Sequence, residues 1–507
     1  MESRKKNTIK NFIISITSYF LNIILSFVVR TVFIKCLSTE YLGVNGLFIN
    51  ILSILSLVEL GAGGAFVSLL YKPLYENDEK KLATIMKTFK KVYFIMALFI
   101  GIIGVFLTPF LDYIIAENTI ENLSVIYIMY IINSVVGYIC ASEKALVKAD
   151  QKSYIVTTII QIAAIAQYVG QIVVLLLTKN YVLFLAIQIV CTILGNIYVS
   201  FWARKKYIFL SQKAEKMDRD TKNEVMKKIR GGFCLHLGYV IASGTDSIVI
   251  SYFLGLTILG IYSNYLLVIG ILEKFVLMIF ESVRASASNF AVSNNYEENY
   301  NLFKKMEFLI IILMGFITTC LIVLFNPFIR VWLSNEYLLE MPLVILATII
   351  NFIGWHGIKL PMSIFRDALG LYYNDRYMYL LESVLNVVIS LVLVKFIGLA
   401  GIFLGTILSS LCTLISGSCI VFKHAFNKSP WYYWRSLITY LFILIPVGAI
   451  TYYLISLLKI NSWISLILAA FTCAAIVILL YVIVFHKKDE FKYYLNFVKL
   501  IMQRKTK

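Results

Sequence analysis

FLIIILMGFITTCLIVLFNPFIR, residues 308–330, carries no charged side chain before its last residue. A helix needs about 20 apolar residues to cross the hydrocarbon core of a bilayer, so this stretch is long enough to span it. Thirteen similar stretches fill most of the 507-residue chain. The fourteen predicted spans are residues 11–33, 42–70, 92–111, 122–142, 154–178, 181–202, 232–254, 257–283, 306–330, 341–364, 377–396, 399–422, 436–458 and 462–485. We therefore predict an all-α integral membrane protein with 14 transmembrane helices.

Composition supports this class. The chain is 60% hydrophobic and only 15% charged, which is too few polar groups to cover the surface of a soluble protein of this size. The first apolar stretch is too long for a cleavable signal and lacks a small-residue cleavage site, so we expect it to be the first span.

The positions of the basic residues, which give the chain a net charge of +18, indicate the membrane topology. Of the 46 Lys and Arg residues, 39 lie at the two ends of the chain or in alternate loops. This is the positive-inside pattern, which predicts that both termini are cytoplasmic. The basic rim attracts anionic membrane lipids and argues against nucleic acid as a partner.

The two halves of the chain repeat. Three short matches lie close to one diagonal, because their offsets in residue number are nearly equal. They pair Leu37–Val44 with Leu254–Ile261, Tyr75–Lys81 with Asn295–Asn301, and Thr108–Leu111 with Asn326–Ile329. Six spans in each repeat keep the two lobes in the same orientation, so we predict a parallel pseudo-repeat plus two C-terminal helices. The predicted domains are an N-lobe (1–203), a cytoplasmic linker (204–230), a C-lobe (231–424), and spans 13 and 14 with a cytoplasmic tail (425–507).

Ionisable residues at membrane depth are the candidate substrate or cavity residues, because charge is costly in lipid and usually faces a cavity or a partner. Arg30 lies about 20 residues into the first span, and it either snorkels to the outer interface or binds phosphate in a cavity. Asp246 lies near the middle of span 7. The repeat sets Arg30 against Ser247, the neighbour of Asp246, so we expect the two charges to approach each other.

Glu59 in span 2 and Glu273 with Lys274 in span 8 lie at similar depth in equivalent helices. They form either ion pairs within a lobe, or an inner gate or cation site. His356 in span 10 is either a hydrogen-bonded interior histidine or a proton relay. Lys359, which follows it, belongs either to the cytoplasmic topology signal or to the cavity.

No P-loop or other enzyme motif occurs in the sequence, and the eight cysteines show no metal-binding spacing. We expect no enzymatic activity, no cofactor and no metal site. A coupling ion, H⁺ or Na⁺, is the one small ligand that remains open.

The chain resembles the bacterial oligosaccharide flippases that export capsule or O-antigen repeat units. These form the polysaccharide-transporter branch of the superfamily that includes the multidrug-and-toxin-extrusion exporters. The residues that carry the resemblance are Arg30 with Leu37–Gly43, Glu59–Gly61 with the Lys72–Lys91 loop, Asp246 with Phe253–Gly255 and Leu259–Tyr262, and Arg366–Gly370, Asn386, Gly398–Gly401 and Gly405–Thr406.

The resemblance implies a substrate, undecaprenyl-diphosphate-linked oligosaccharide, moved across the bacterial cytoplasmic membrane by alternating access of two lobes. It also implies that the polymerase and glycosyltransferases of the same pathway are partners. An ion-coupled small-molecule exporter shares this architecture and is the alternative. A membrane enzyme would need a large outward loop, and the outward connections here are short.

The topology can be tested by labelling single cysteines with a membrane-impermeant reagent. Cysteines placed at Lys80, Lys216 and Lys428 should be protected in intact cells, whereas those at Glu117 and Asn335 should react. Labelling at position 216 in intact cells would contradict the 14-span topology.

Overall fold

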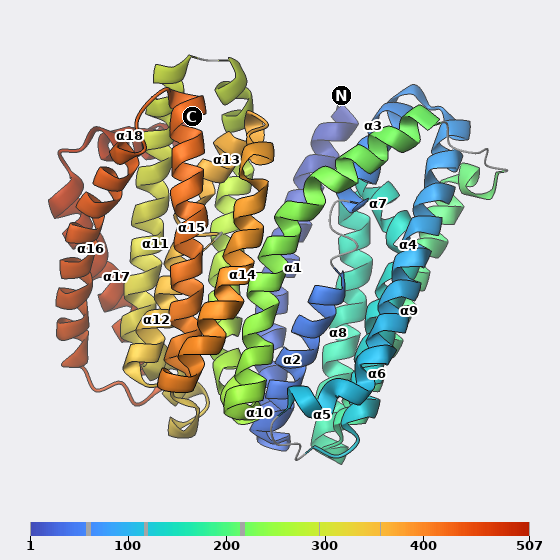
Figure 1. The fold of residues 1–507 in the computed structure, drawn as a ribbon, viewed down its shortest axis with the longest axis horizontal. Helices are drawn as coiled ribbons and strands as arrows, with labels where there is room; N and C mark the ends of the chain where they lie inside the picture. Colours follow the sequence, from blue (N-terminus) through green and yellow to red (C-terminus); the bar gives the residue numbers. More distant parts are fainter. Residues whose placement is uncertain are drawn as a thin grey trace. The chain divides into compact units, whose positions relative to one another are not determined.

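The computed structural model describes residues 2–56, 62–115, 120–212, 219–293, 295–354 and 356–505. It contains 18 α-helices and a few 3-10 turns, and no strand occurs among these residues (Figure 1). Glu59, Glu117 and Lys216, which were singled out above, lie outside the described residues.

Within the described part of the chain, nine helices are each long and apolar enough to cross a membrane. They are α1 (Glu2–Cys36), α4 (Glu79–Leu107), α8 (Ser153–Thr178), α9 (Tyr181–Lys206), α11 (Tyr296–Trp332), α14 (Tyr372–Ile397), α15 (Leu399–Phe426), α16 (Trp431–Ser456) and α17 (Trp463–Phe485). The other predicted spans fall on α2 (Thr39–Leu55) with α3 (Ala62–Glu76), α6 (Leu123–Ile139) with α7 (Ala141–Ala149), α10 (Arg219–Ser293), and α12 (Met341–Ile353) with α13 (Leu360–Ala368). The predicted class, an all-α multi-pass membrane protein, is confirmed.

A sharp bend follows one predicted span, and a break interrupts another. The span predicted at 122–142 corresponds to α6, and α7, which follows it directly, is bent by 42° relative to α6. The span predicted at 341–364 is interrupted between α12 and α13. Pro361 occupies the first turn of α13, where its missing N–H is tolerated. A Cβ on Gly357 would lie 2.1 Å from the carbonyl oxygen of Phe352, so only glycine allows the chain to fold back there.

α10 contains the two predicted spans 232–254 and 257–283, joined at Gly255. Gly255 has φ 84° and ψ 167°, a backbone conformation that glycine adopts at little cost. The helix also begins at Arg219, inside the predicted linker, so the second half of that segment continues directly into the membrane span.

The chain divides into two compact units, Met1–Gly260 and Ile261–Lys507. In the first unit α8 packs against α1 and α9, and α6 packs against α4 and α9. In the second unit α14 and α15 form the most extensive helix pair, and α11 contacts α12, α16 and α17. The predicted domain boundaries come from the sequence repeat, whereas these two units are defined by compactness. The division into compact units therefore does not test the predicted boundaries, and they stay predictions.

Local features recur at the offset that the sequence repeat predicts. α1 ends just before Ser38, and α10 breaks at Gly255, the position equivalent to Ser38 in the second repeat. The Asp78 side chain caps α4 by accepting a hydrogen bond from the Lys81 N–H at 2.9 Å. Asn295, which follows Asp78 at the offset of the Leu37–Val44 match, caps α11 in the same way. This recurrence of a break and a cap supports the repeat found in the sequence.

α2 and α10 touch backbone to backbone within the first unit. A Cβ on Gly43 would lie 2.1 Å from the Leu256 carbonyl oxygen, and a Cβ on Gly260 would lie 2.3 Å from the Thr39 carbonyl oxygen. The two contacts are reciprocal, because Leu256 and Gly260 are the repeat equivalents of Thr39 and Gly43. Small residues allow such close approach of helices in membranes.

Side chains on the outside of the spans are large and apolar. Leu177 and Phe396 are each 78% exposed, and Phe442 is 76% exposed. An aqueous surface would not tolerate so much exposed apolar area, whereas lipid tails solvate it. Inside the bilayer the backbone must be satisfied by its own hydrogen bonds, which the helices achieve.

The Gly43 contact predicts a specific sensitivity. Gly43→Ala places its methyl group against a backbone carbonyl that cannot rotate away, and we expect it to destabilise the protein by about 1–3 kcal/mol. Gly137→Ala is the matched control, since a Cβ on Gly137 meets nothing within 4 Å. Thermal unfolding of the purified protein in detergent measures both. Equal melting temperatures for the two variants would contradict the close approach of α2 and α10.

Candidate functional site

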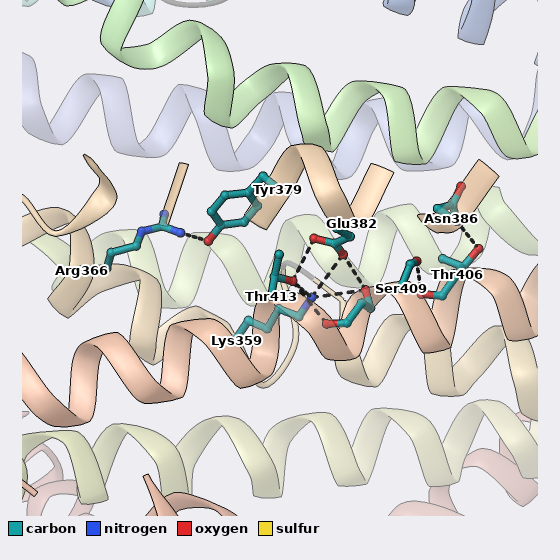
Figure 2. Close-up of polar contacts among 9 residues, drawn as sticks. Lys359, Arg366, Tyr379, Glu382, Asn386, Thr406, Ser409 and Thr413 are labelled. Carbon is teal, nitrogen blue, oxygen red and sulfur yellow. Dashed lines mark hydrogen bonds and ion pairs between the residues drawn. The ribbon is translucent and has the colours of Figure 1, made fainter. Parts of the chain in front are cut away.

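A buried polar cluster lies in the second unit, where α13 begins beside the α14–α15 pair (Figure 2). Lys359 immediately precedes α13 and is 8% exposed. Its ammonium Nζ lies 3.4 Å from Glu382 Oε1, 3.2 Å from Ser410 Oγ and 2.7 Å from Thr413 Oγ1. Lys359, near the cytoplasmic end of the predicted span 341–364, is therefore part of an internal ion pair.

The Glu382 carboxylate is satisfied by the same two hydroxyls. Ser410 Oγ donates to Oε1 at 2.9 Å, and Thr413 Oγ1 donates to Oε2 at 2.8 Å. Glu382 is 3% exposed. Ser410 and Thr413 are three residues apart on α15, so they share one face of that helix. Each hydroxyl accepts from the ammonium and donates to the carboxylate, which offsets the cost of burying both charges.

A small polar cavity adjoins this ion pair. It has a volume of about 20 Å³ and is lined by Lys359, Ser363, Arg366, Tyr379 and Thr413, among others. That volume holds one water molecule. The Arg366 guanidinium donates to the Tyr379 hydroxyl at this cavity (Figure 2).

Arg366 links the buried cluster to the more exposed end of the unit. Its guanidinium lies 2.9 Å from Asp367, whose carboxylate also lies 3.2 Å from Arg284 of α10. Arg284 in turn pairs with Glu281 at 2.8 Å. The Asp367 side chain is 42% exposed, while the Arg366 side chain is 7% exposed. A chain of charged groups thus runs from the surface to the cavity.

From the buried polar cluster, further polar side chains continue along α14 and α15, in the direction away from Arg366. Asn386 donates to Thr406 Oγ1 at 3.0 Å, and Ser390 donates to the Ile402 carbonyl oxygen at 3.4 Å. Tyr379, Glu382, Asn386 and Ser390 follow each other at intervals of three or four residues, so they lie on one face of α14. The result is a file of polar side chains within an otherwise apolar helix pair.

Three other predicted residues belong to the second unit. His356 Nδ1 is 3.8 Å from Glu273 Oε2, with side chains 25% and 32% exposed. Lys274 is exposed. The structure therefore brings His356 and Glu273 together, and it places Lys359 in a separate, buried cluster.

In the first unit, Arg30 is half-buried on α1. The phenols of Tyr130 on α6 and Tyr181 on α9 lie within electrostatic reach of its guanidinium. The two hydroxyl oxygens are 2.7 Å apart, and the Tyr130 hydroxyl donates to Asn45 Oδ1 at 2.5 Å. The guanidinium thus has polar surroundings inside the helix bundle.

Asp246 is half-buried on α10. Its neighbour Ser247 accepts a hydrogen bond from the Asn50 side chain of α2 at 2.7 Å. The predicted approach of Arg30 and Asp246 remains a prediction. Glu59, the third candidate in this half, lies outside the described residues.

Sequence reasoning missed Glu382, Ser410 and Thr413. Glu382 is a single carboxylate inside the predicted span 377–396, so its position at membrane depth was a usable signal. Its pairing with Lys359 could not be predicted, because the two residues are 23 apart in the chain and lie on different helical segments. Among the described residues, no group of three or more His, Cys, Asp or Glu side chains is arranged to hold a metal ion.

The model of the polysaccharide biosynthesis protein family matches residues 8–285. Because the match covers more than half of the chain, this chain belongs to that family. Comparison with curated protein sequences gave no match.

Several solved structures share the fold. The lipid II flippase MurJ in an inward closed conformation superposes with a TM-score of 0.68 at 17% identity, over 94% of this chain and 99% of that chain. An inward-facing MATE family multidrug transporter of the MOP superfamily gives 0.60 at 12% identity, over 79% and 92%. The MATE multidrug transporter DinF-BH gives 0.58 at 14% identity, over 83% and 97%. The chain therefore has a fold used by transporters.

The ion pair predicts a clear stability pattern. Lys359→Met leaves a buried carboxylate without its cation, and we expect a loss of about 3–5 kcal/mol. The double variant Lys359→Met with Glu382→Gln removes both charges and should recover most of that loss. Lys274→Met, at an exposed lysine, is the control and should unfold like the unaltered protein. Thermal unfolding in detergent is the measurement, and additive losses in the double variant would contradict the pairing.

Proposed function

We propose that this protein is a flippase that moves polyprenyl-diphosphate-linked oligosaccharide repeat units across the bacterial cytoplasmic membrane, for capsule or another surface polysaccharide. Undecaprenyl diphosphate is the carrier that the resemblance implies. Translocation proceeds by alternating access of the two lobes, with both termini cytoplasmic. The enzymes that build and polymerise the repeat unit would be its functional partners.

Family membership carries this proposal. The polysaccharide biosynthesis model matches the first six predicted spans and α10 up to residue 285. The fold over 94% of the chain is that of a protein described as a lipid II flippase. A lipid-linked saccharide is the substrate class that links these two observations.

Arg30 supports a substrate with a diphosphate. A planar guanidinium binds phosphate oxygens through two parallel hydrogen bonds, which lysine cannot reproduce. Its phenol neighbours, Tyr130 and Tyr181, supply hydroxyl donors to the same region. A diphosphate that leaves the headgroup layer needs such a fixed cation and donors to replace its lost water.

A large apolar groove in the second unit supports a substrate with a lipid chain. It has a volume of about 690 Å³ and lies between α11, α12, α15 and α16. Its walls are aliphatic, including Ile345 and Ile349 of α12, Leu411 of α15, and Leu441 and Leu444 of α16. α16 is one of the two helices beyond the six-span repeat. We assign the groove to the polyprenyl chain, which gains free energy from apolar contact over its whole length.

An ion-coupled small-molecule exporter is the second candidate, because the MATE transporters share the fold. Such an exporter needs only a compact pocket for a drug-sized molecule. Transport of a cationic dye by the purified protein in proteoliposomes, with no effect on surface polysaccharide in cells, would favour this candidate.

The test of the flippase uses Arg30. Arg30→Ala should reduce surface polysaccharide to background in a strain that lacks its own flippase gene, because the diphosphate loses its cation. Arg30→Lys should retain partial activity, since it keeps the positive charge but loses the planar guanidinium that makes two parallel hydrogen bonds to phosphate. Lys35→Ala is the control, an exposed lysine in the last turn of the same helix. Full activity of Arg30→Ala at normal protein level would instead assign Arg30 to the membrane interface.

A further inference from the structure

We propose that the last helix of this protein lies in the membrane surface and, with two neighbouring lysines, forms a binding site for an anionic phospholipid headgroup. The helix is α18 (Asp489–Lys505), which follows the last span (Figure 1). The two lysines, Lys305 of α11 and Lys488 directly before α18, are both half-buried. This inference goes beyond the proposed function, because it concerns a lipid of the surrounding membrane and not the transported molecule.

α18 is attached where the hydrocarbon core begins. The Tyr494 hydroxyl of α18 donates to the Lys305 carbonyl oxygen at 3.1 Å, and the Tyr494 ring stacks on the ring of Phe308 with centroids 6.4 Å apart. Lys305 and Phe308 lie on either side of residue 306, where the sequence predicts that a span starts. A helix held at this point of α11 is therefore at the depth of the lipid headgroups.

The exposed side of α18 carries one polar face. Lys492, Asn496, Lys499 and Gln503 are all exposed, and they follow each other at intervals of three or four residues. Residues at this spacing share one face of a helix. Lys488 continues the same line one turn earlier, so this face is basic at its start and polar throughout.

Exposed apolar side chains flank the polar face. Tyr493, Leu495 and Phe497 are 45%, 40% and 53% exposed. At 100° per residue, Leu495 lies on one side of the polar face, and Tyr493 and Phe497 lie on the other. A helix with a basic polar face between apolar and aromatic side chains is typical of one that lies in the plane of the membrane surface.

The two half-buried lysines are held over aromatic rings. Lys305 Nζ lies 4.0 Å from the ring centroid of Tyr493, and Lys488 Nζ lies 4.0 Å from that of Tyr440 on α16. Such contacts attract and orient an ammonium group but leave its charge uncompensated. Neither lysine forms an ion pair with a carboxylate of the described residues. Both therefore remain able to bind an anion.

One aromatic cluster connects the two lysines. The Phe308 ring lies 6.2 Å from the Tyr440 ring and 5.6 Å from the Phe485 ring, in addition to its stacking on Tyr494. Tyr494 in turn contacts Tyr493, with centroids 5.2 Å apart. Lys305 and Lys488 thus border the same junction of α11, α16, α17 and α18.

The charge around this junction selects an anionic partner. Residues 486–507 contain seven Lys and Arg and only two acidic residues. Of the acidic residues, Asp489 pairs with Lys492 at 3.7 Å, and Glu490 lies within electrostatic reach of Lys488, as does the buried Glu307. The net charge stays positive. A phospholipid provides a phosphate for the lysines and acyl chains for the apolar spans below, which a soluble anion does not.

Lipid binding is the first test, measured by native mass spectrometry of the full-length protein in detergent. The probes are phosphatidylglycerol, which is anionic, and phosphatidylcholine, which has no net charge. Lys305→Gln with Lys488→Gln should weaken phosphatidylglycerol binding at least tenfold, because each lysine near an anionic surface contributes about fivefold. Phosphatidylcholine binding should stay unchanged, and an equal loss for both lipids would overturn the proposal.

The matched control is Lys90→Gln with Lys91→Gln, two exposed lysines of α4 that directly precede the predicted span 92–111. This variant removes the same charge from the basic rim of the first unit and should bind phosphatidylglycerol like the unaltered protein. An equal loss in the two double variants would mean that the whole rim attracts lipid without a defined site, and it would overturn the proposal.

The position of α18 is the second test, and it leaves the lysines unchanged. Spin labels are attached to Phe497→Cys or to Asn496→Cys in the full-length protein without its other cysteines, reconstituted into liposomes. The label at 497 should collide with oxygen, which concentrates in lipid, and the label at 496 with a water-soluble nickel chelate. Equal access of nickel to both positions would place α18 in water and overturn the proposal. Shielding of position 497 from both reagents would mean that protein covers this side of α18, which would overturn it as well.

Discussion

Hydrogen bonding of the backbone inside lipid is the constraint on which this structure depends. Water is absent from the bilayer core, so each N–H and C=O must find a partner within the chain. The described spans meet this demand as helices, and interruptions of the helices are closed locally. At Gly255 the chain turns with a glycine conformation, and at Gly357 it folds back onto the end of α12. At these two positions, irregular backbone occurs where glycine makes it inexpensive.

The same constraint governs side chains. A charge within a span must be paired or must face water, and the second unit pairs Lys359 with Glu382 between two hydroxyls. Replacing such a pair with apolar residues is often neutral for stability, whereas removal of one partner alone is costly because it leaves the other charge buried and unpaired. Lys359 lies at the break between α12 and α13, so this charge is next to an interruption in a predicted span.

Each half of the chain contains a different polar centre. The first unit holds Arg30 among phenols, a net positive site suited to a phosphate. The second unit holds a charge-neutral pair and an apolar groove of about 690 Å³. The substrate proposed above needs both kinds of surface, since its diphosphate and its lipid chain differ in what they bind.

The sequence alone determined the class, the spans and the offset of the internal repeat, because long apolar runs, loop charges and short matching segments can be read directly along the chain. It also identified Arg30 and Asp246 as costly groups at membrane depth, and it left Lys359 open between the cytoplasmic topology signal and the cavity. The bend after span 4, the break in span 10 and the partners of Lys359 were decided by tertiary structure. Glu382, Ser410 and Thr413 are distant from Lys359 in the chain, on helices that meet it only when α13 packs beside α14 and α15. Apolar periodicity places helices in the membrane, but it does not specify which buried polar faces meet.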